Sequence, residues 1–446
     1  MELKCRDPEQ RMARLSPWKR GRSESWGPYQ ICCHSFWEKF DTNTDANIDL
    51  DLDIKKLALK VSPFVVSLVS LAAGKPLFMA SGTITKSEEV NGTYFSSILT
   101  SASLLRTSAE SDAIPDDIKV NVHIRDGTLC EGQVLAYDWH YNIAWIKIKS
   151  DAPLATASLR LLDDSMSVVP SGIQDKELGS DCFQLHPHSD FFKLCPGDMV
   201  VAVGRYFQPP DEIMAAPGRF SLDCCDFDCK ELLWGNCKIS EVCGIGGPLI
   251  NRHGEVIGVN FYDRLCTPFL PISIASKCLE HLKKYRRFCR PLLGMEITNL
   301  YAASLGKLDR INLKFPNESN GVFVEKVRYP LHMILDGSVT EIFLESHASL
   351  QNLPNINQVI GGSPAECAGI LSGDVIVQCA GNFVQSVLEF YGISWDKCGE
   401  SVEVVVLRSR TGDRLNLTLK VGETSSDKIN RWPLPERCRV DVKRVR

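Results

Sequence analysis

The stretch Cys243-Gly244-Ile245-Gly246-Gly247-Pro248-Leu249-Ile250 decides how this chain is interpreted. Two adjacent glycines allow a tight backbone turn, and the apolar residues that follow them begin a strand. A second apolar run, from Glu255 to Tyr262, comes directly afterwards. We therefore expect a turn that joins two strands. The residue before the glycine pair is Ile245, whose hydrocarbon side chain has no proton to give up and no lone pair with which to attack a substrate.

Length and composition indicate an ordinary globular protein of several domains. At about 150 residues per domain, 446 residues suggest two or three domains. The net charge of -5 gives no overall basic character, so neither nucleic acid nor an anionic membrane is an expected partner. The first forty residues contain no apolar run of the length that a signal peptide or a spanning helix needs. The default location is therefore the cytoplasm or the nucleus.

The 18 cysteines are scattered along the chain, and without a secretory signal we interpret them as reduced thiols. The densest group consists of Cys224, Cys225, Cys229, Cys237 and Cys243. Its spacing lacks the paired Cys-x2-Cys knuckles that structural zinc favours, which favours free thiols over a metal site. The sequence therefore predicts neither a metal nor a cofactor.

The N-terminal stretch differs in texture from the rest of the chain. Residues 1–57 lack periodicity, and the segment from Asp41 to Asp53 is rich in Asp and Asn, which predicts a disordered arm. Phe36, Trp37 and Phe40 are exceptions within it. We prefer local packing of these aromatic residues, with docking on another subunit as the alternative.

From residue 58 the sequence changes to short β-rich runs separated by polar, Gly-containing turns, a pattern typical of antiparallel barrels. The first set of strand candidates is Phe64–Leu71, Leu77–Thr85, Tyr94–Thr100, Ile118–Ile124, Gly132–Tyr137 and Ile143–Ile148. The second set is Met199–Val203, Leu232–Ile239, Pro248–Ile250, Glu255–Tyr262 and Phe269–Ile272. Two barrels over residues 58–289 follow, closed by an amphipathic helix from Ile274 to Phe288. Between the sets, Asp163–Pro196 is expected to be an irregular surface loop.

A third unit is expected over residues 290–423. Its strand candidates are Gly321–Val327, Asp374–Ala380, Ser401–Arg408 and Arg414–Val421, with a short helix in the stretch Gly362–Asp374. Small strands around a short helix suggest an independent binding module. Residues 424–446 form a basic tail, which we interpret as solvated.

Motifs in this order resemble the HtrA (protease Do-like) family, and in particular its degenerate plant-type members. They are Ser81-Gly82-Thr83, Ile98-Leu99-Thr100-Ser101-Ala102-Ser103, Asn142-Ile143-Ala144, Pro196-Gly197-Asp198 and the Gly246-Gly247-Pro248-Leu249 turn. The resemblance covers roughly Val61 to Val421. It implies a mostly β fold, in which a trypsin-like double β-barrel is followed by a PDZ-like α+β domain.

The resemblance places the family's catalytic triad at Ser103, Asn142 and Ile245. Ser103 stands in place of the histidine, and a hydroxyl cannot serve as the general base near pH 7. Asn142 stands in place of the aspartate, and its amide cannot stabilise an imidazolium by charge. Because Ile245 replaces the nucleophile, no catalytic position is intact, and we expect a proteolytically inactive protein that acts in peptide or protein binding. A serine endopeptidase of the family, taking part in protein quality control, is the alternative.

Neighbouring residues offer poor substitutes for the triad. His140 and Cys243 each lie two residues before a triad position, and a Cys-His pair is a known nucleophile arrangement. Such a pair would need a rebuilt turn, because active geometry tolerates only a small error. Ser240 is a poorer candidate still.

The stretch Leu292, Leu293, Gly294, Met295 resembles the family's carboxylate-binding loop. In that loop, backbone N–H groups receive a peptide C-terminus while the peptide adds a strand to the sheet edge. The resemblance therefore implies peptide or protein C-termini as partners and, since the family forms trimers, a homo- or hetero-oligomer. Residues 328–360 depart from the family as an insertion. We consider three structures for Leu331–Leu350, namely a helix, a segment that covers the peptide-binding groove, and a disordered segment.

Overall fold

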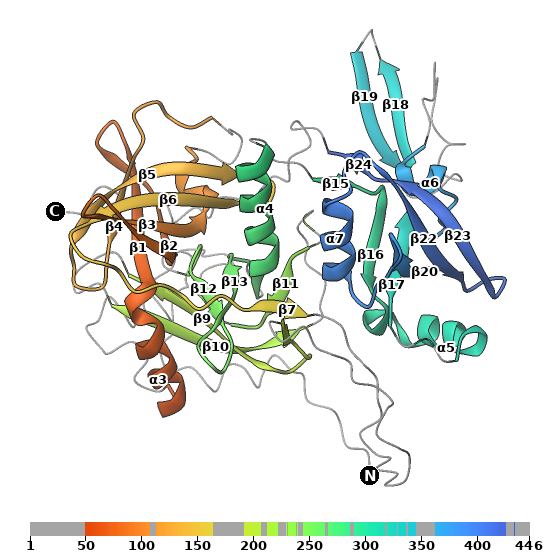
Figure 1. Ribbon diagram of the computed structural model, residues 1–446, viewed down its shortest axis with the longest axis horizontal. Coiled ribbons are helices and arrows are strands. Elements are labelled where there is room, and N and C mark those ends of the chain that lie inside the picture. Colours follow the sequence, from red (N-terminus) through yellow and green to blue (C-terminus); the bar gives the residue numbers. More distant parts are fainter. Residues whose placement is uncertain are drawn as a thin grey trace, which may run out of the picture. The chain divides into compact units, whose positions relative to one another are not determined.

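The fold is mostly β and consists of two closed six-stranded barrels followed by a separate C-terminal sheet (Figure 1). The computed structural model describes residues 50–107, 113–163, 191–206, 212–221, 229, 231–237, 239, 244–263, 266–285, 290–316, 318, 320–327, 329–335, 338–344, 362–424 and 432. This architecture confirms the predicted fold class. Within these residues, no helix combines the length and the apolar character that crossing a membrane requires.

The first barrel is built from six strands in the spatial order β1-β2-β3-β6-β5-β4, all with antiparallel neighbours. They are β1 (Val65–Ala72), β2 (Lys75–Val90), β3 (Thr93–Ser101), β4 (Lys119–His123), β5 (Leu129–Asp138) and β6 (Ile143–Ser150). The barrel closes between β1 and β4, where Leu68 pairs with Val122. Each strand overlaps a predicted one. The short helix η2 (Ala102–Leu105) follows β3 and carries Ser103.

The second barrel has the order β10-β11-β14-β13-β12-β9. Its strands are β9 (Met199–Arg205), β10 (Ile213–Ser221), β11 (Leu233–Gly235), β12 (Pro248–Ile250), β13 (Val256–Asn260) and β14 (Thr267–Pro271). The sequence analysis missed β10, because Pro217 and Gly218 at its centre are residues that rarely occupy strand interiors. Gly218 is required by close packing, since a Cβ atom there would lie 2.6 Å from the backbone nitrogen of Cys237.

The stretch between the two barrels contains a pair of short parallel strands. They are β7 (Leu161–Asp163) and β8 (Phe191–Lys193), at the two ends of the segment for which we predicted an irregular loop. Residues 164–190 lie outside the described part of the chain.

Two helices cover the double barrel. Helix α4 (Ile272–Tyr285) confirms the predicted closing helix. Helix α3 (Leu52–Val61) corrects the prediction that the disordered arm extends to residue 57. The carboxylate of Asp51 caps α3 by accepting a hydrogen bond from the Asp53 N–H at 2.8 Å. Ile54, Ala58 and Val61, at helical spacing, are buried in the barrel core. Residues 1–49, which include Phe36, Trp37 and Phe40, lie outside the described chain.

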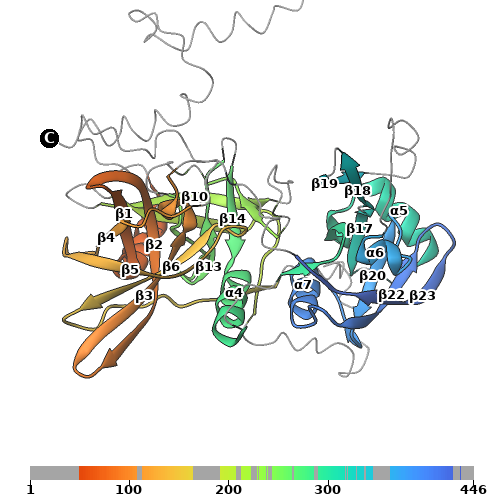
Figure 2. The same ribbon diagram turned by 90° about the horizontal axis from the view of Figure 1, so that it is seen from above.

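The C-terminal unit is a sheet in the order β16-β17-β20-β22-β23. Its strands are β16 (Met295–Asn299), β17 (Val322–Val327), β20 (Asp374–Cys379), β22 (Ser401–Arg408) and β23 (Asp413–Lys420), with the short β21 (Asn382–Phe383) beside β20 and a β15 (Pro291–Leu292) to β24 (Gly422–Glu423) pair. Its helical segments are η3 (Leu300–Ala302), α5 (Leu305–Lys314), α6 (Pro364–Cys367) and α7 (Val387–Trp395). Helices α6 and α7 lie against the sheet (Figure 2). Strand β16 is at one edge of this sheet, beside α7.

The predicted insertion contains a β-hairpin. Strand β18 (Tyr329–Leu335) pairs antiparallel with β19 (Ser338–Leu344). A helix over Leu331–Leu350 is therefore wrong as far as residue 344, and the enrichment of β19 in Val, Thr, Ile and Phe accounts for the strand. Residues 345–361 lie outside the described chain.

Candidate functional site

The fold brings the elements that carry the three triad positions together where the two barrels meet. Ser103 and Asn142 come from the first barrel, and Ile245 from the turn before β12. The carbonyl of Ile245 accepts a hydrogen bond from the Ser81 N–H of the first barrel at 2.8 Å. All three side chains are buried, with 2–3% of their surface exposed.

Ser103 and Asn142 form a closed pair of neutral groups. The Ser103 Oγ lies 3.1 Å from Asn142 Oδ1, to which it donates, and 3.0 Å from Asn142 Nδ2, from which it accepts. Asn142 has a positive φ of 53°, a conformation that Asn and Asp tolerate better than other residues with side chains. The amide therefore suits the same backbone turn as a carboxylate, but it brings no charge. A hydroxyl paired with an amide provides no base that could activate a nucleophile.

The glycine turn beside Ile245 is fixed by packing. Gly246 has a φ of 77°, and its N–H donates to the Asn260 carbonyl at 2.8 Å. A Cβ atom at Gly246 would lie 2.6 Å from the Ser81 carbonyl oxygen, and one at Gly247 would lie 2.2 Å from the Val203 carbonyl oxygen. Among the described residues, the N–H of Ile245 has no acceptor. Cys243 and Ser240 lie outside the described chain.

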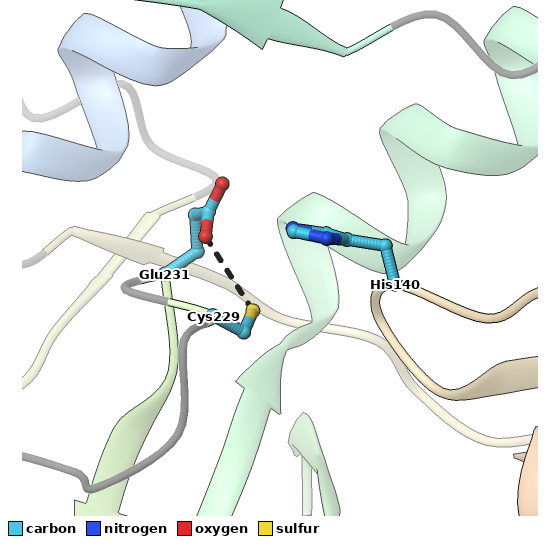
Figure 3. Close-up of side chains that lie close together, drawn as sticks. All are labelled: His140, Cys229 and Glu231. Atoms are coloured by element: carbon cyan, nitrogen blue, oxygen red, sulfur yellow. Dashed lines mark hydrogen bonds between the residues drawn. The ribbon is translucent and has the colours of Figure 1, made fainter. Parts of the chain in front are cut away.

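Beside this site, three side chains with metal-binding atoms converge (Figure 3). They are His140 from the turn between β5 and β6, and Cys229 and Glu231 from the segment before β11; their ligand atoms all lie within 4.8 Å of one another. The Cys229 thiol donates to Glu231 Oε2 at 3.4 Å, and the Tyr141 hydroxyl donates to Glu231 Oε1 at 2.9 Å. Burial, reinforced by the charge of Arg290, lowers the pKa of His140 to about 3, and burial raises the pKa of Glu231. His140 is therefore neutral near pH 7, and burial favours the protonated form of Glu231.

This grouping differs from the cysteine cluster considered in the sequence. Of those five cysteines only Cys229 belongs to it. Cys237 follows β11 in the sequence, and its thiol donates to the Val200 carbonyl oxygen at 3.9 Å. The remaining three lie outside the described residues. His140 therefore stands with Cys229, and the side chain of Cys229 is fully buried, which makes it unsuitable as a nucleophile for an external substrate.

Trp432 packs beside the same turn and corrects the prediction that the tail is solvated throughout. Its side chain is only 3% exposed. The indole Nε1 donates to the His140 carbonyl oxygen at 2.8 Å, and the Trp432 carbonyl oxygen accepts from Arg106 Nη1 at 2.8 Å. Its ring centroid lies 4.5 Å from that of Phe261, which follows β13. The residues on either side of Trp432 lie outside the described chain.

The stretch compared with a carboxylate-binding loop has a conformation that leaves donors available. Leu292 pairs with Gly422, and Met295 opens the edge strand β16. Between them, the Leu293 carbonyl accepts from the Ala365 N–H at 3.0 Å, and the carbonyl of Gly294, whose φ is 73°, accepts from the Ser363 Oγ at 3.3 Å. In the part of the chain that the structure covers, the N–H groups of Leu293 and Gly294 have no acceptor.

Comparison with known proteins gives similarity at the level of sequence. Residues 80–259 match the trypsin-like peptidase domain family. A protein named protease Do-like 14, from Arabidopsis thaliana, is 30% identical over 324 residues, covering 69% of this chain and 58% of that protein. The serine protease HhoB of Synechocystis is 24% identical over 312 residues, covering 68% of this chain and 58% of that protein. The chain thus spans less than two thirds of the length of these relatives.

Solved structures with a similar chain include the HtrA-type protease AlgW with a tripeptide, at 18% identity and a TM-score of 0.47, covering 83% of this chain and 97% of that one. A serine endoprotease from Yersinia pestis has 17% identity and a TM-score of 0.42, covering 84% and 100%. The fold assignment itself stands on the two closed barrels, and the sequence matches extend over them. The chain belongs to the HtrA, or Do-like, family of serine protease homologues.

Proposed function

We propose that this chain is a proteolytically inactive member of its family that acts by binding peptide or protein C-termini through its PDZ-like unit. The observation that carries the first half is the hydrogen-bonded pair of Ser103 and Asn142, with Ile245 at the nucleophile position. Acyl transfer needs a nucleophile, a base and a group that orients the base. The three positions supply a hydrocarbon, a hydroxyl and an uncharged amide.

The glycine turn and the buried pair account for these positions without catalysis. The glycines of the turn are needed because Cβ atoms would collide with backbone oxygens of both barrels. The Ser103–Asn142 pair satisfies two buried polar groups, which would otherwise destabilise the fold. This barrel region is therefore explained by packing and hydrogen bonding alone.

The peptide-binding part of the proposal rests on the N–H groups of Leu293 and Gly294, which have no acceptor among the described residues and precede the edge strand of the described sheet. A peptide carboxylate accepts hydrogen bonds from adjacent backbone N–H groups in such a turn, and the peptide backbone extends the sheet by pairing with the edge strand. Strand β16 is that edge, with α7 beside it. The anchoring of the Leu293 and Gly294 carbonyls by Ala365 and Ser363 holds the donors in place before a peptide arrives.

The proposed absence of proteolytic activity is tested by incubating the purified full chain with unfolded protein substrates and with a serine-directed phosphonate probe. We expect neither hydrolysis nor labelling. A sample with Ser103→Ala is purified in parallel. Hydrolysis that separates from the chain on further purification would identify a contaminant. Inhibitor-sensitive hydrolysis that stays with the chain, with or without Ser103, would overturn the proposal and favour the endopeptidase alternative.

The binding half is tested with a library of peptides that end in free carboxylates, measured by fluorescence polarisation against the full chain. Each binder is then compared with the same peptide carrying a C-terminal amide. Because the amide removes the charge that the N–H groups receive, we expect its affinity to fall by about tenfold or more. Binders that tolerate the amide, or an absence of binders, would contradict a carboxylate site. Light scattering of the same sample determines whether the chain is an oligomer, which the family resemblance leads us to expect.

A further inference from the structure

His140, Cys229 and Glu231 bring a nitrogen, a sulfur and an oxygen donor together at the junction of the two barrels (Figure 3). His140 belongs to the first barrel, whereas Cys229 and Glu231 precede β11 of the second. Imidazole, thiolate and carboxylate are the side chains that bind zinc in proteins. We infer that this trio is a zinc-binding site that ties the two barrels together.

The geometry lies close to what a zinc ion requires. With bond lengths of about 2.0–2.3 Å and tetrahedral angles, the donor atoms around zinc lie roughly 3.3–3.6 Å apart. The Cys229 Sγ and Glu231 Oε2 are already 3.4 Å apart. All three donor atoms lie within 4.8 Å of one another, so small side-chain adjustments complete the arrangement.

Neighbouring groups hold the ligands in the orientation that a metal site needs. The Tyr141 hydroxyl donates to Glu231 Oε1 and leaves Oε2 directed at the Cys229 thiol. Trp432 Nε1 donates to the His140 backbone carbonyl and fixes the turn from which the imidazole projects. Such outer contacts orient ligands and contribute to metal affinity. Tyr141 and Trp432, which make these contacts, are not among the three positions that match the catalytic triad.

The charge balance also fits a divalent ion. A Cys229 thiolate and a Glu231 carboxylate together carry two negative charges, which neutralise one zinc ion. The nearby Arg290 is already paired with Asp138, with Nη1 2.9 Å from Oδ2. A zinc ion held by these two anionic ligands therefore leaves the buried site without net charge, and burying charge without compensation is what a protein interior resists.

Without metal, the same residues form a hydrogen-bonded cluster. Each carboxyl oxygen of Glu231 accepts a hydrogen bond, one from Cys229 and one from Tyr141. A purely structural polar cluster is therefore the competing explanation, and it predicts no affinity for metal. Three protein ligands also leave a fourth coordination position for water, as in zinc sites that are not closed.

The test uses the full chain, stripped of metal with a chelator and titrated with zinc chloride or cobalt(II) chloride. We expect about one metal per chain, a thiolate-to-cobalt charge-transfer absorption band, and a higher melting temperature with zinc. Cys229→Ser abolishes the charge-transfer band and lowers zinc affinity by about a hundredfold or more, because it removes a ligand. The matched control is Cys237→Ser, a buried thiol of the same barrel that lies outside the trio, which keeps both signals.

Two further variants keep the inference testable if Cys229→Ser does not fold. Glu231→Gln and His140→Gln each remove one ligand and are expected to lower the zinc affinity while retaining the cobalt–thiolate band at high cobalt concentration. Wild-type chain that binds no zinc, or a cobalt spectrum without a thiolate band, would overturn the inference. So would a Cys229→Ser variant with unchanged affinity. None of these outcomes depends on whether the barrels hydrolyse peptides.

Discussion

Two glycine turns in this molecule have similar backbone conformations but differ in the hydrogen bonding of the glycine N–H group. In the double barrel, Gly246 has a φ of 77° and its N–H is bonded to the Asn260 carbonyl. In the PDZ-like unit, Gly294 has a φ of 73°, and its N–H has no acceptor among the described residues. A Cβ atom at either glycine would collide with a neighbour, 2.6 Å from Ser81 O in the first case and 2.3 Å from Ser363 Cβ in the second.

On the proposed function, the glycine turn persists in a chain that no longer carries out its family's proteolysis. Catalysis requires three particular side chains, and replacing each of them at Ser103, Asn142 and Ile245 leaves the glycine turn intact, because the turn is also needed for packing. Carboxylate binding needs only backbone donors and an open edge, which substitutions of side chains seldom remove. On the proposed function, peptide binding therefore survives substitutions that remove catalysis.

The largest expected effect comes from adding a methyl group to each turn. Gly246→Ala places a Cβ atom against the Ser81 carbonyl and forces Ala into a left-handed conformation, so we expect a loss of about 3 kcal/mol or more in the free energy of unfolding. Denaturation monitored by circular dichroism measures it. In Gly294→Ala the added Cβ atom collides with the Ser363 side chain. We expect this variant to lose peptide binding and to keep the zinc affinity of the wild type.

These two variants separate the regions if each affects its own property. Gly246→Ala at a temperature where it stays folded should keep its affinity for carboxylate peptides. If Gly294→Ala bound peptides with wild-type affinity, the loop would not be the carboxylate site. If Gly246→Ala were as stable as the wild type, packing would no longer explain why the barrel turn persists.

Trp432 provides the next largest effect. Trp432→Ala removes a buried ring that contacts Phe261 and a hydrogen bond to the His140 carbonyl, so we expect about 2–3 kcal/mol of destabilisation. The matched variant Trp432→Phe keeps an aromatic ring but loses the hydrogen bond and part of the buried indole, for which about 1–2 kcal/mol is expected. Chemical denaturation of the three proteins gives both values. Equal stability of all three would mean that Trp432 does not pack on the barrel in solution.

The sequence predicted those features that depend on local pattern. The alternation of apolar residues and the turns between them located all six strands of the first barrel, because side-chain alternation is a short-range property. It failed at β10, where Pro217 and Gly218 interrupt the pattern but fit a site of close backbone approach. At α3 the signal was present, as Asp51 followed by apolar residues at helical spacing, and the acidic neighbourhood concealed it.

The candidate sites divide in the same way. Ser103, Asn142 and Ile245 could be located because each stands inside a short motif that the family resemblance aligns. The grouping of His140 with Cys229 and Glu231 could not be predicted, because His140 and Cys229 are 89 positions apart in the sequence and no local spacing relates them. Only the closure of the two barrels against each other sets that distance.

A smaller effect is expected at the buried pair of the barrel. Ser103→Ala leaves the Asn142 amide without its hydroxyl partner, so we expect the free energy of unfolding to fall by about 1–2 kcal/mol. The control is Ser67→Ala in β1, a buried serine whose Oγ has no hydrogen-bond partner in the described structure. Its loss is expected to be neutral or slightly stabilising. Equal destabilisation by both substitutions would show that the Ser103–Asn142 bond contributes nothing specific.

The smallest expected effect is the most informative about catalysis. Ile245→Ser restores a hydroxyl before Gly246, yet we expect no measurable hydrolysis and no labelling by a serine-directed probe. Neither Ser103 nor Asn142, at the other two triad positions, can accept the proton of the new hydroxyl near pH 7. The matched variant combines Ile245→Ser with Ser103→His and Asn142→Asp, which returns all three groups together. Labelling of the single variant would mean that another residue, with His140 as the first candidate, supplies the base, and the barrel would then be one substitution away from a protease.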